Sequence, residues 1–457
     1  MKIALISTYE LGRQPFGLAS PAGWLVRRGH EVVCLDVSRE AADERAIREA
    51  GLIGFYVPMH TAARLTLESM EPVRKLNPRA HICVFGLYAS MNEQSFRRAG
   101  AHCVLDAEFE EDLARLADSV SKGQIAGLRG FGGAARGKAL PRLKFKKPDR
   151  SALPALRKYA HLVMPDGMHR TTGYTEASRG CKHVCRHCPI VPVYDGQFRV
   201  VQADIVLEDI RQQVRAGAQH ITFGDPDFFN GLTHGLRIVE KLHEEFPELT
   251  YDATIKIEHL KKHRKQLERL RETGCAFVTS AVESLDDEVL AKLEKGHTRR
   301  DFVEALEQCR KIGLGFQPTF VAFTPWTTAK SYLDLLRTIA ELDLAETVAP
   351  IQLGIRLLIP NGSRLLELEE IRRIAEPFDE RALVYPWRHE EPRMDALAEA
   401  VQRAATNAES RKLSRRESFE SIWDLAQEAL SAPAAPLHLP VLRDRATIPY
   451  LNEPWYC

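Results

Sequence analysis

Three cysteines, Cys181, Cys185 and Cys188, lie within eight residues of one another, in a stretch that Gly180 precedes and Pro189 closes. Thiolates crowded in this way are the usual protein ligands of iron–sulfur clusters. Three thiolates on a four-iron cluster leave one iron without a protein ligand, and that iron is open to a reactant. The spacing therefore predicts a reactive [4Fe-4S] cluster at this loop.

The alternative is a zinc site in a non-catalytic metal-binding or sensor protein. Structural zinc usually takes four ligands, commonly two pairs of cysteines or a mixed set of cysteine and histidine. His183 or His187 could supply the fourth ligand in this loop. A colourless protein that contains zinc and no iron would support this alternative.

The cysteine spacing and the preceding Ser-Arg-Gly resemble the cluster loop of radical S-adenosylmethionine (SAM) enzymes. The resemblance implies that SAM chelates the open iron, and that an electron from the cluster breaks a carbon–sulfur bond and releases a radical. It also implies that His187 stands where the family places a residue, usually aromatic, that contacts the adenine of SAM. Histidine departs from that pattern, although its backbone can still make the contact.

Two later segments resemble SAM-binding segments of the same family. The first, residues 222–228, resembles the segment whose backbone holds the amino group of SAM, and it contains Gly224, Asp225 and Pro226. Asp225 could instead cap the turn that follows it. The second contains Glu283 and Ser284, followed by Lys-Gly-His-Thr at 295–298, and resembles the strand end that binds the ribose or methionine part of SAM.

Two charged residues, Lys256 and Arg356, are expected at strand ends where a core would be apolar. They could reach the surface along their aliphatic stems, or point inward to meet the SAM carboxylate or a substrate. Both are therefore candidate SAM-binding residues.

The elements that must position these residues follow a repeating pattern of helix and strand from residue 168 to residue 380. Strands are expected before Cys181 and at 220–223, 251–255, 276–281, 317–323 and 351–358. Six strands alternating with helices predict a partial (β/α)6 radical SAM barrel, with its site at the carboxyl ends of the strands.

Residues 1–122 also alternate strand and helix, which is typical of a doubly wound parallel sheet of the α/β class. Segments 15–19, 85–90 and 106–110 resemble the cobalamin-binding domain that precedes the barrel in one class of radical SAM enzymes. The resemblance implies cobalamin contacts at Pro15, Gly17, Gly86 and Tyr88. The sequence contains no Asp-x-His-x-x-Gly loop that could supply a histidine ligand to cobalamin. Because relatives bind cobalamin without that histidine, its absence leaves both alternatives open, a domain that binds cobalamin and one that does not.

A linker rich in glycine, proline and basic residues is expected at 123–167. A solvated crossing between domains is the favoured interpretation, and a clamp for a phosphate-bearing ligand is the alternative. Residues 381–457 predict a helical region over 394–430 and then an extended tail that ends in Trp455, Tyr456 and Cys457.

The tail, with residues 9–22 and 220–230, resembles the CUAEP/CCAEP-tail radical SAM proteins over nearly the whole chain. The family tail continues as cysteine or selenocysteine followed by Ala-Glu-Pro. We therefore expect the gene to continue past Cys457 through a UGA codon read as selenocysteine. We also expect the tail to reach the barrel mouth, where Cys457 would offer a soft nucleophile or ligand to the substrate.

The composition argues against several classes of partner. With 63 basic and 62 acidic side chains the net charge is +1, which disfavours a nucleic acid or an anionic membrane held by bulk charge. No apolar run approaches the ~18 residues of a membrane span. Nine cysteines, an odd number, fit a reducing cytoplasm, and five of them are expected to be buried small residues, at positions 34, 83, 103, 275 and 309.

Together these patterns predict a cytoplasmic radical SAM enzyme that uses a [4Fe-4S] cluster and SAM. Its substrate would be a small molecule, and its electron donor a protein such as flavodoxin or ferredoxin. If cobalamin is bound, methyl transfer is the expected chemistry. Without cobalamin, transfer of a SAM fragment to a soft acceptor held by tail thiols, such as arsenic or selenium, is the alternative.

Overall fold

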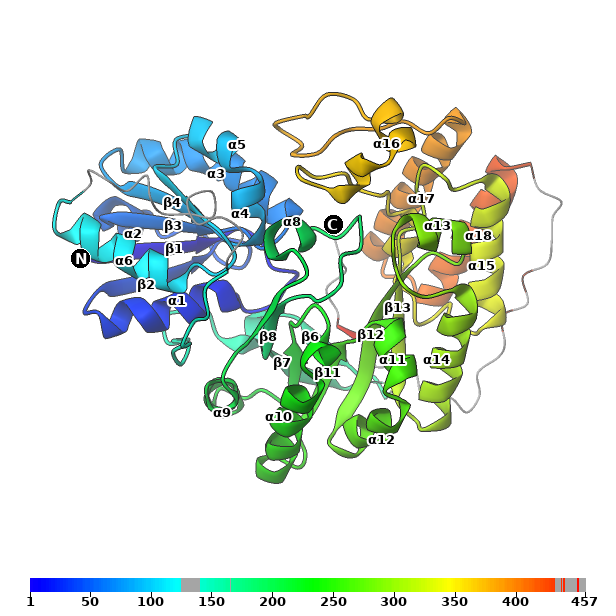
Figure 1. Ribbon diagram of the computed structural model, residues 1–457, viewed down its shortest axis with the longest axis horizontal. Helices are drawn as coiled ribbons and strands as arrows, with labels where there is room; N and C mark the ends of the chain where they lie inside the picture. The colour runs from blue at the N-terminus through cyan, green and yellow to red at the C-terminus, as the bar shows by residue number, and fades with distance from the viewer. Residues whose placement is uncertain (125–139, 165, 432–436, 438, 440–449, 452–457) are drawn as a thin grey trace.

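The structure is a computed structural model that describes residues 1–124, 140–164, 166–431, 437, 439 and 450–451. An N-terminal α/β domain lies beside a second, larger α/β unit, and a pair of C-terminal helices packs on the far side of that unit (Figure 1). The predicted fold class, a doubly wound sheet followed by a partial barrel and a helical region, is confirmed.

The N-terminal domain is built on five parallel strands in the order β2-β1-β3-β4-β5. Their bounds are β1 (Lys2–Ser7), β2 (Glu31–Asp36), β3 (Leu52–Tyr56), β4 (His81–Phe85) and β5 (Cys103–Leu105). The connecting helices are α1 (Phe16–Arg27), α2 (Glu44–Glu49), α3 (His60–Leu76), α4 (Leu87–Met91), α5 (Glu93–Arg98) and α6 (Glu110–Ser121).

Two separate apolar clusters cover the two faces of this sheet, which is what a doubly wound fold requires. The strand order reverses between β1 and β3, so the loops after these two strands diverge and leave a crevice at their carboxyl ends. That edge faces the second domain.

The second domain contains a seven-stranded sheet in the order β13-β12-β11-β10-β7-β6-β14. Its parallel strands are β7 (His169–Thr175), β10 (His220–Phe223), β11 (Thr250–Thr254), β12 (Cys275–Glu283) and β13 (Gly315–Phe320). Two short antiparallel strands extend the β7 edge, β6 (His161–Val163) and β14 (Tyr450–Leu451). Because β6 and β14 are distant in sequence, the end of the chain returns to the edge of this sheet.

The strand expected at 351–358 is replaced by a short 3-10 helix, η4 (Pro350–Gly354), and a single parallel bridge between Phe323 and Arg356. Pro350 lies in the first turn of η4 and lacks a backbone N–H, so it fits a helical turn better than a strand ladder. The sixth barrel position is therefore occupied by one bridge and not by a regular strand.

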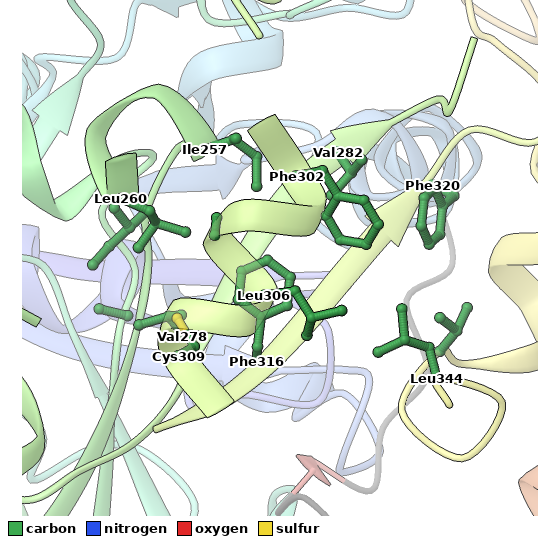
Figure 2. Close-up of a cluster of buried hydrophobic side chains, with 14 of the residues drawn as sticks. Ile257, Leu260, Val278, Val282, Phe302, Leu306, Cys309, Phe316, Phe320 and Leu344 are labelled. Atoms are coloured by element: carbon green, nitrogen blue, oxygen red, sulfur yellow. The ribbon is translucent and has the colours of Figure 1, made fainter. Parts of the chain in front are cut away.

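Helices cover the outer face of the barrel sheet, and their apolar sides form the largest core of the molecule. They are α9 (Ala203–Arg215), α10 (Leu232–Glu245), α11 (Ile257–Lys262), α12 (Arg264–Glu272), α14 (Arg299–Lys311) and α15 (Ala329–Glu341). A further helix, α13 (Asp287–Lys292), packs its apolar side into a smaller, separate cluster. Figure 2 shows Phe302, Leu306 and Cys309 of α14 against side chains of β12 and β13. All five cysteines expected as small core residues are buried.

The predicted C-terminal helical region consists of α17 (Pro392–Ser410) and α18 (Arg415–Ala429). Both helices add apolar side chains to the barrel core, so the region is part of the domain and not a loose appendage. A shorter helix, α16 (Glu369–Ile374), precedes them. Among the described residues, no helix combines the length and apolar character needed to span a membrane.

Within the expected linker, Arg150 joins the two domains. Its guanidinium donates to both carboxylate oxygens of Asp209, at 2.7 and 2.8 Å, and also reaches Gln14 and the Tyr174 carbonyl. The Arg150 and Asp209 side chains are 7% and 1% exposed, so at this residue the linker is buried and not solvated. The glycine-rich part of the linker, 125–139, lies outside the described residues.

Candidate active site

The three cysteines lie in the loop between the short strand β8 (Ser178–Gly180) and the helix α8 (Val191–Tyr194). β8 pairs with β9 (Phe198–Val200), which holds both ends of the loop together. Gly180 has φ +72°, and a Cβ at this position would lie 2.3 Å from the Tyr194 ring and 2.5 Å from the Gln197 carbonyl oxygen. Glycine is therefore required where the chain enters the loop.

Protein surrounds the cysteines of the loop to different degrees, and Cys181 and Cys188 are half-buried. Cys185 is buried, and burial raises the pKa of the Cys188 thiol to about 12 and that of Cys181 above its usual value. A thiolate at these positions needs a positive charge beside it, which a bound metal supplies. Three thiols on one short loop are the donor set of a [4Fe-4S] cluster with one open iron, and the residues present fit that group.

Two of the predicted SAM-binding residues, His187 and Glu283, come together beside the cysteine loop. Nε2 of His187 lies 3.1 Å from Oε1 of Glu283, and Nζ of Lys295 lies 3.2 Å from the same oxygen. Burial alone would raise the pKa of Glu283, but Lys295 and His187 outweigh it and hold the pKa well below its usual value. Glu283 is therefore a buried carboxylate held ionised between two cationic or hydrogen-bonding groups.

Glu283 ends strand β12 with φ +68°, and the pairing of β12 with β13 shifts register just before it. A non-glycine residue in this conformation costs about 1–3 kcal/mol and is common at functional sites. The bend lets Ser284 follow with its hydroxyl oxygen accepting a hydrogen bond from the Asp286 N–H at 3.1 Å. Glu283 and Ser284 thus stand together at a strand end.

Gly224, Asp225 and Pro226 follow β10, and the carboxylate of Asp225 is already engaged. It accepts hydrogen bonds from the Ala177 N–H at 2.9 Å and from the Ser178 hydroxyl, and burial raises the pKa of Asp225 to about 7. The carboxyl therefore fastens β10 to the segment that leads into the cysteines. A Cβ on Gly224 would lie 1.9 Å from the Tyr174 hydroxyl, so that residue must be glycine.

The two other charged candidates are separated by the structure. Lys256, two residues after β11, is buried, and its Nζ lies 3.6 Å from the carboxylate of Glu258, which is itself 3.6 Å from His183 of the cysteine loop. Arg356 is not brought to this group. Its guanidinium pairs with Asp395 of α17 and stacks 4.2 Å from the centre of the Trp387 ring.

Both ends of the cysteine loop are fixed to the N-terminal domain. Arg179, just before the loop, donates from Nη1 and Nη2 to the Glu110 carboxylate at 3.0 and 2.6 Å, and the Arg179 and Glu110 side chains are 8% and 0% exposed. Tyr194, just after the loop, donates its hydroxyl to Glu108 at 2.8 Å. The position of the cluster site therefore depends on contacts between the two domains.

Glu108 makes this contact sensitive to pH. Burial raises its pKa from 4.5 to about 7, although Arg179 opposes the shift. A carboxyl whose pKa is higher in the folded state stabilises the fold below its unfolded pKa, and this contribution is lost as the pH rises through the folded pKa. Relative to Glu108→Gln, the free energy of unfolding of the wild type should fall by up to about 1.4 kcal/mol per pH unit between about pH 5 and 7. Urea unfolding across this range measures the difference, and parallel slopes for the two proteins would contradict the assignment.

A pocket of about 200 Å³ lies between the two domains, next to the cysteine loop. The N-terminal domain lines it with residues at the carboxyl ends of its strands, including Glu10, Tyr56 and Phe109. The barrel lines it with Gly180, Gly224, Pro226 and Tyr194, among others. The pocket thus joins the edge where a doubly wound sheet binds ligands to Gly180 of the cysteine loop and to Gly224 of the predicted SAM segment.

The residues expected to contact cobalamin lie at this sheet edge. Pro15 precedes α1, and Tyr88 is buried in α4. The Tyr56 ring fills the space above Gly17, where a Cβ would lie 2.1–2.3 Å from three ring atoms, and Gly86, with φ +115°, turns tightly against the Val57 carbonyl. The Tyr56 ring therefore occupies space beside Gly17 at the edge of the pocket, and a ligand that covers Gly17 would have to displace this side chain.

Cys457, expected at the barrel mouth, lies outside the described residues, and the hypotheses about its thiol and about the tail stay predictions.

Residues 175–326 match the family model described as the radical SAM superfamily. The match contains the three cysteines, Gly224, Glu283 and Lys295. Over these residues the chain matches the radical SAM superfamily, and the chain is an enzyme that uses a [4Fe-4S] cluster and SAM.

The chain is similar to an uncharacterized methyltransferase of Pyrococcus horikoshii, with 23% identity over 72% of this chain and 74% of the relative. It is also similar to the hopanoid C-3 methylase of Methylococcus capsulatus, with 24% identity over 68% of this chain and 62% of the methylase. The chain thus spans less than two thirds of the length of the second relative.

Two solved structures share the fold across both domains. TsrM from Kitasatospora setae, a radical SAM methyltransferase with tryptophan and a SAM analog bound, superposes over 94% of this chain and 100% of its own, with a TM-score of 0.67 and 16% identity. OxsB, a cobalamin-dependent SAM radical enzyme with aqua-cobalamin bound, superposes over 94% of this chain and 72% of its own, with a TM-score of 0.67 and 14% identity.

Sequence reasoning missed three residues that shape this site, Arg179, Tyr194 and Lys295. Lys295 was available as the first residue of the Lys-Gly-His-Thr motif, but its role as the cation beside Glu283 needed the fold. Arg179 belongs to the motif that precedes the cysteines, and its partner Glu110 is in another domain. No local pattern points to Tyr194.

Proposed function

We propose that the protein is a radical SAM methyltransferase that modifies a small molecule bound between its two domains. The observation that carries the proposal is the pocket at which the carboxyl edge of the N-terminal sheet meets the cysteine loop. A substrate in this pocket would contact residues of both domains while lying close to the loop that holds the cluster. The names of the curated relatives support methyl transfer as the reaction.

The chain's own residues would divide the work of binding SAM. Cys181, Cys185 and Cys188 would hold the cluster, which supplies the electron for reductive cleavage of SAM. Glu283, held ionised by Lys295, has the charge to accept hydrogen bonds from ribose hydroxyls or to pair with the SAM ammonium. Lys256, buried on the cluster side, has the charge to meet the SAM carboxylate.

Asp225 lies in the segment that resembles the one holding the amino group of SAM, but its carboxylate does not contact SAM in the arrangement we propose. Its carboxyl is occupied by Ala177 and Ser178, so the backbone after Gly224 would present carbonyl oxygens to the SAM amino group while Asp225 holds that backbone in place. Asp225 is thus proposed as a positioning residue.

Cobalamin as the methyl carrier is a second candidate feature, and the superposition on OxsB over 94% of the chain favours it. The position of Tyr56 above Gly17 opposes it, so we derive no step through cobalamin. Without cobalamin, transfer of a SAM fragment to a soft acceptor at the tail thiols is the alternative that follows from the sequence. We further propose a cytoplasmic location, because the cluster thiols need a reducing environment. We also propose a flavodoxin or ferredoxin as the donor of the electron that the cluster passes to SAM.

The test begins with protein expressed and purified without oxygen while cobalamin is supplied. We expect broad iron–sulfur absorption and about four irons per chain, and loss of both in Cys185→Ala. With a chemical reductant, SAM carrying an isotope-labelled methyl group and a small-molecule extract, the wild type should place the label on a compound that mass spectrometry detects. Cys185→Ala is the control that should transfer no label.

Two outcomes distinguish the alternatives. SAM cleavage without any labelled product other than SAM-derived fragments would contradict methyl transfer while leaving the radical SAM assignment intact. Cobalt analysis of the same sample decides the cofactor question, since about one cobalt per chain requires Tyr56 to move, and its absence removes cobalamin from the reaction.

A further inference from the structure

A group of three side chains beside the cysteine loop has no role in the function proposed above. His183 comes from the loop itself, between Cys181 and Cys185, Asp227 precedes the 3-10 helix η3 (Phe228–Gly231), and His259 belongs to α11. Their potential ligand atoms all lie within 4.8 Å of one another. The fold thus brings together two imidazoles and a carboxylate from three separate elements.

The two imidazole nitrogens face the same carboxylate oxygen of Asp227. Nδ1 of His259 lies 2.7 Å from Oδ2 of Asp227, and Nε2 of His183 lies 3.6 Å from it. Ligand atoms bound at about 2.0–2.1 Å to a tetrahedral zinc ion lie about 3.3 Å apart. The two separations lie on either side of that value, so small side-chain movements would complete the geometry.

All three atoms are buried, and within the described residues none has a hydrogen-bond partner of acceptable geometry. The Asp227 side chain is 0% exposed, and its other oxygen, Oδ1, accepts a hydrogen bond from the Phe229 N–H at 3.2 Å. Leaving a buried polar group unsatisfied costs about 1–3 kcal/mol, and an unpaired buried charge costs more. Three such atoms that face one another therefore call for a bound group that satisfies them together.

We propose that His183, Asp227 and His259 form a mononuclear site for a divalent transition metal such as zinc or iron(II). Two imidazoles and one carboxylate are a known donor set for both ions and a poor one for magnesium or calcium, which prefer oxygen ligands. The single negative charge of Asp227 and the divalent ion leave one net positive charge. Glu258, 3.6 Å from Nδ1 of His183, lies where a carboxylate that orients a metal-bound histidine is usually found.

Such an ion would connect the cysteine loop to η3 and α11, and three protein ligands would leave a coordination position open to a small ligand. The site is distinct from the cluster because none of its ligands is a thiol. The metal site would exist whichever reaction the enzyme performs, so this proposal does not depend on methyl transfer.

The first experiment measures metal in a background without the cluster, Cys181→Ala/Cys185→Ala/Cys188→Ala. After purification without chelators, this protein should retain about one zinc or iron per chain. After removal of metal, cobalt(II) should bind and produce visible d–d bands, and both His259→Ala and Asp227→Asn should weaken cobalt binding by more than about 100-fold. Glu258→Gln should weaken it about 10–100-fold, as expected for a residue that orients a ligand.

His263→Ala is the matched control because His263 ends the same helix and its ring lies 5.8 Å from that of His259, yet it is outside the ligand set. Its cobalt affinity should equal that of the parent. Absence of metal from the parent, equal affinity in His259→Ala, or equal loss in His263→Ala would each overturn the proposal, and would indicate an ordinary Asp–His ion pair or a bound water.

A second measurement uses the intact protein, in case the cysteine-free protein does not fold. X-ray absorption at the zinc edge of the reconstituted holoenzyme should show nitrogen and oxygen ligands at about 2.0–2.1 Å and no sulfur at about 2.3 Å. Sulfur scattering would mean that zinc occupies the cysteine loop, and a holoenzyme without zinc or additional iron would overturn the site.

Discussion

Gly180→Ala is expected to abolish cluster binding, lowering iron from about four per chain to less than one, and to lower the free energy of unfolding by about 2–4 kcal/mol. Two separate costs add at this residue. The added Cβ makes the φ of +72° unfavourable, and it would lie 2.3 Å from the Tyr194 ring and 2.5 Å from the Gln197 carbonyl oxygen. Neither group can move easily, because the Tyr194 side chain is buried and donates a hydrogen bond to Glu108, and the Gln197 oxygen belongs to the backbone.

Gly167→Ala separates the two costs. Gly167 has a similar φ of +78°, but a Cβ there would meet nothing within 4 Å. We expect this control to lose about 1–2 kcal/mol and to keep its iron. Denaturant unfolding and iron analysis of the two variants, both reconstituted without oxygen, make the comparison. Full iron content in Gly180→Ala would show that the loop tolerates the clash, and that its entry does not position the thiols.

Local patterns in the sequence were enough to predict the cysteine loop and the order of strands and helices. The cluster ligands are adjacent in sequence, so their spacing alone defines the donor set. Periodicity located β12 and α14, because the alternation of buried and exposed residues is set by each element on its own. It failed at 351–358, where apolar residues suggest a strand but Pro350 begins a 3-10 turn.

The partners of each charged group could not be predicted, since they come from distant parts of the chain. The sequence suggested that Arg356 could point toward SAM, but its guanidinium forms an ion pair with Asp395 of α17. Asp225 was a candidate because segment 222–228 resembles the segment that holds the amino group of SAM, whereas the structure brings Asp227, two residues later, to His183 and His259. A buried cation or carboxylate acquires its role from whatever the fold places opposite it, and only tertiary structure supplies that partner.

The contact between Arg179 and Glu110 has the second largest expected effect. Glu110→Gln removes the carboxylate that accepts two hydrogen bonds from Arg179 and one from Ser20 at 2.7 Å. Breaking one partner of a buried ion pair typically costs about 3–5 kcal/mol because the other charge stays buried without compensation. Glu176, 2.6 Å from Nε of Arg179, keeps part of the charge balanced, so we expect a loss of about 3 kcal/mol in urea unfolding.

The same variant should also lose iron, because Arg179 is one residue from Gly180 and transmits the displacement to the cysteines. Glu111→Gln, an exposed neighbour on α6, is the matched control and should change the free energy of unfolding by less than about 0.5 kcal/mol. The double variant Glu110→Gln/Arg179→Met removes the uncompensated charge and should be more stable than Glu110→Gln alone. If instead the two substitutions were additive, the pair would not be coupled, and the N-terminal domain would not hold the cluster loop through this contact.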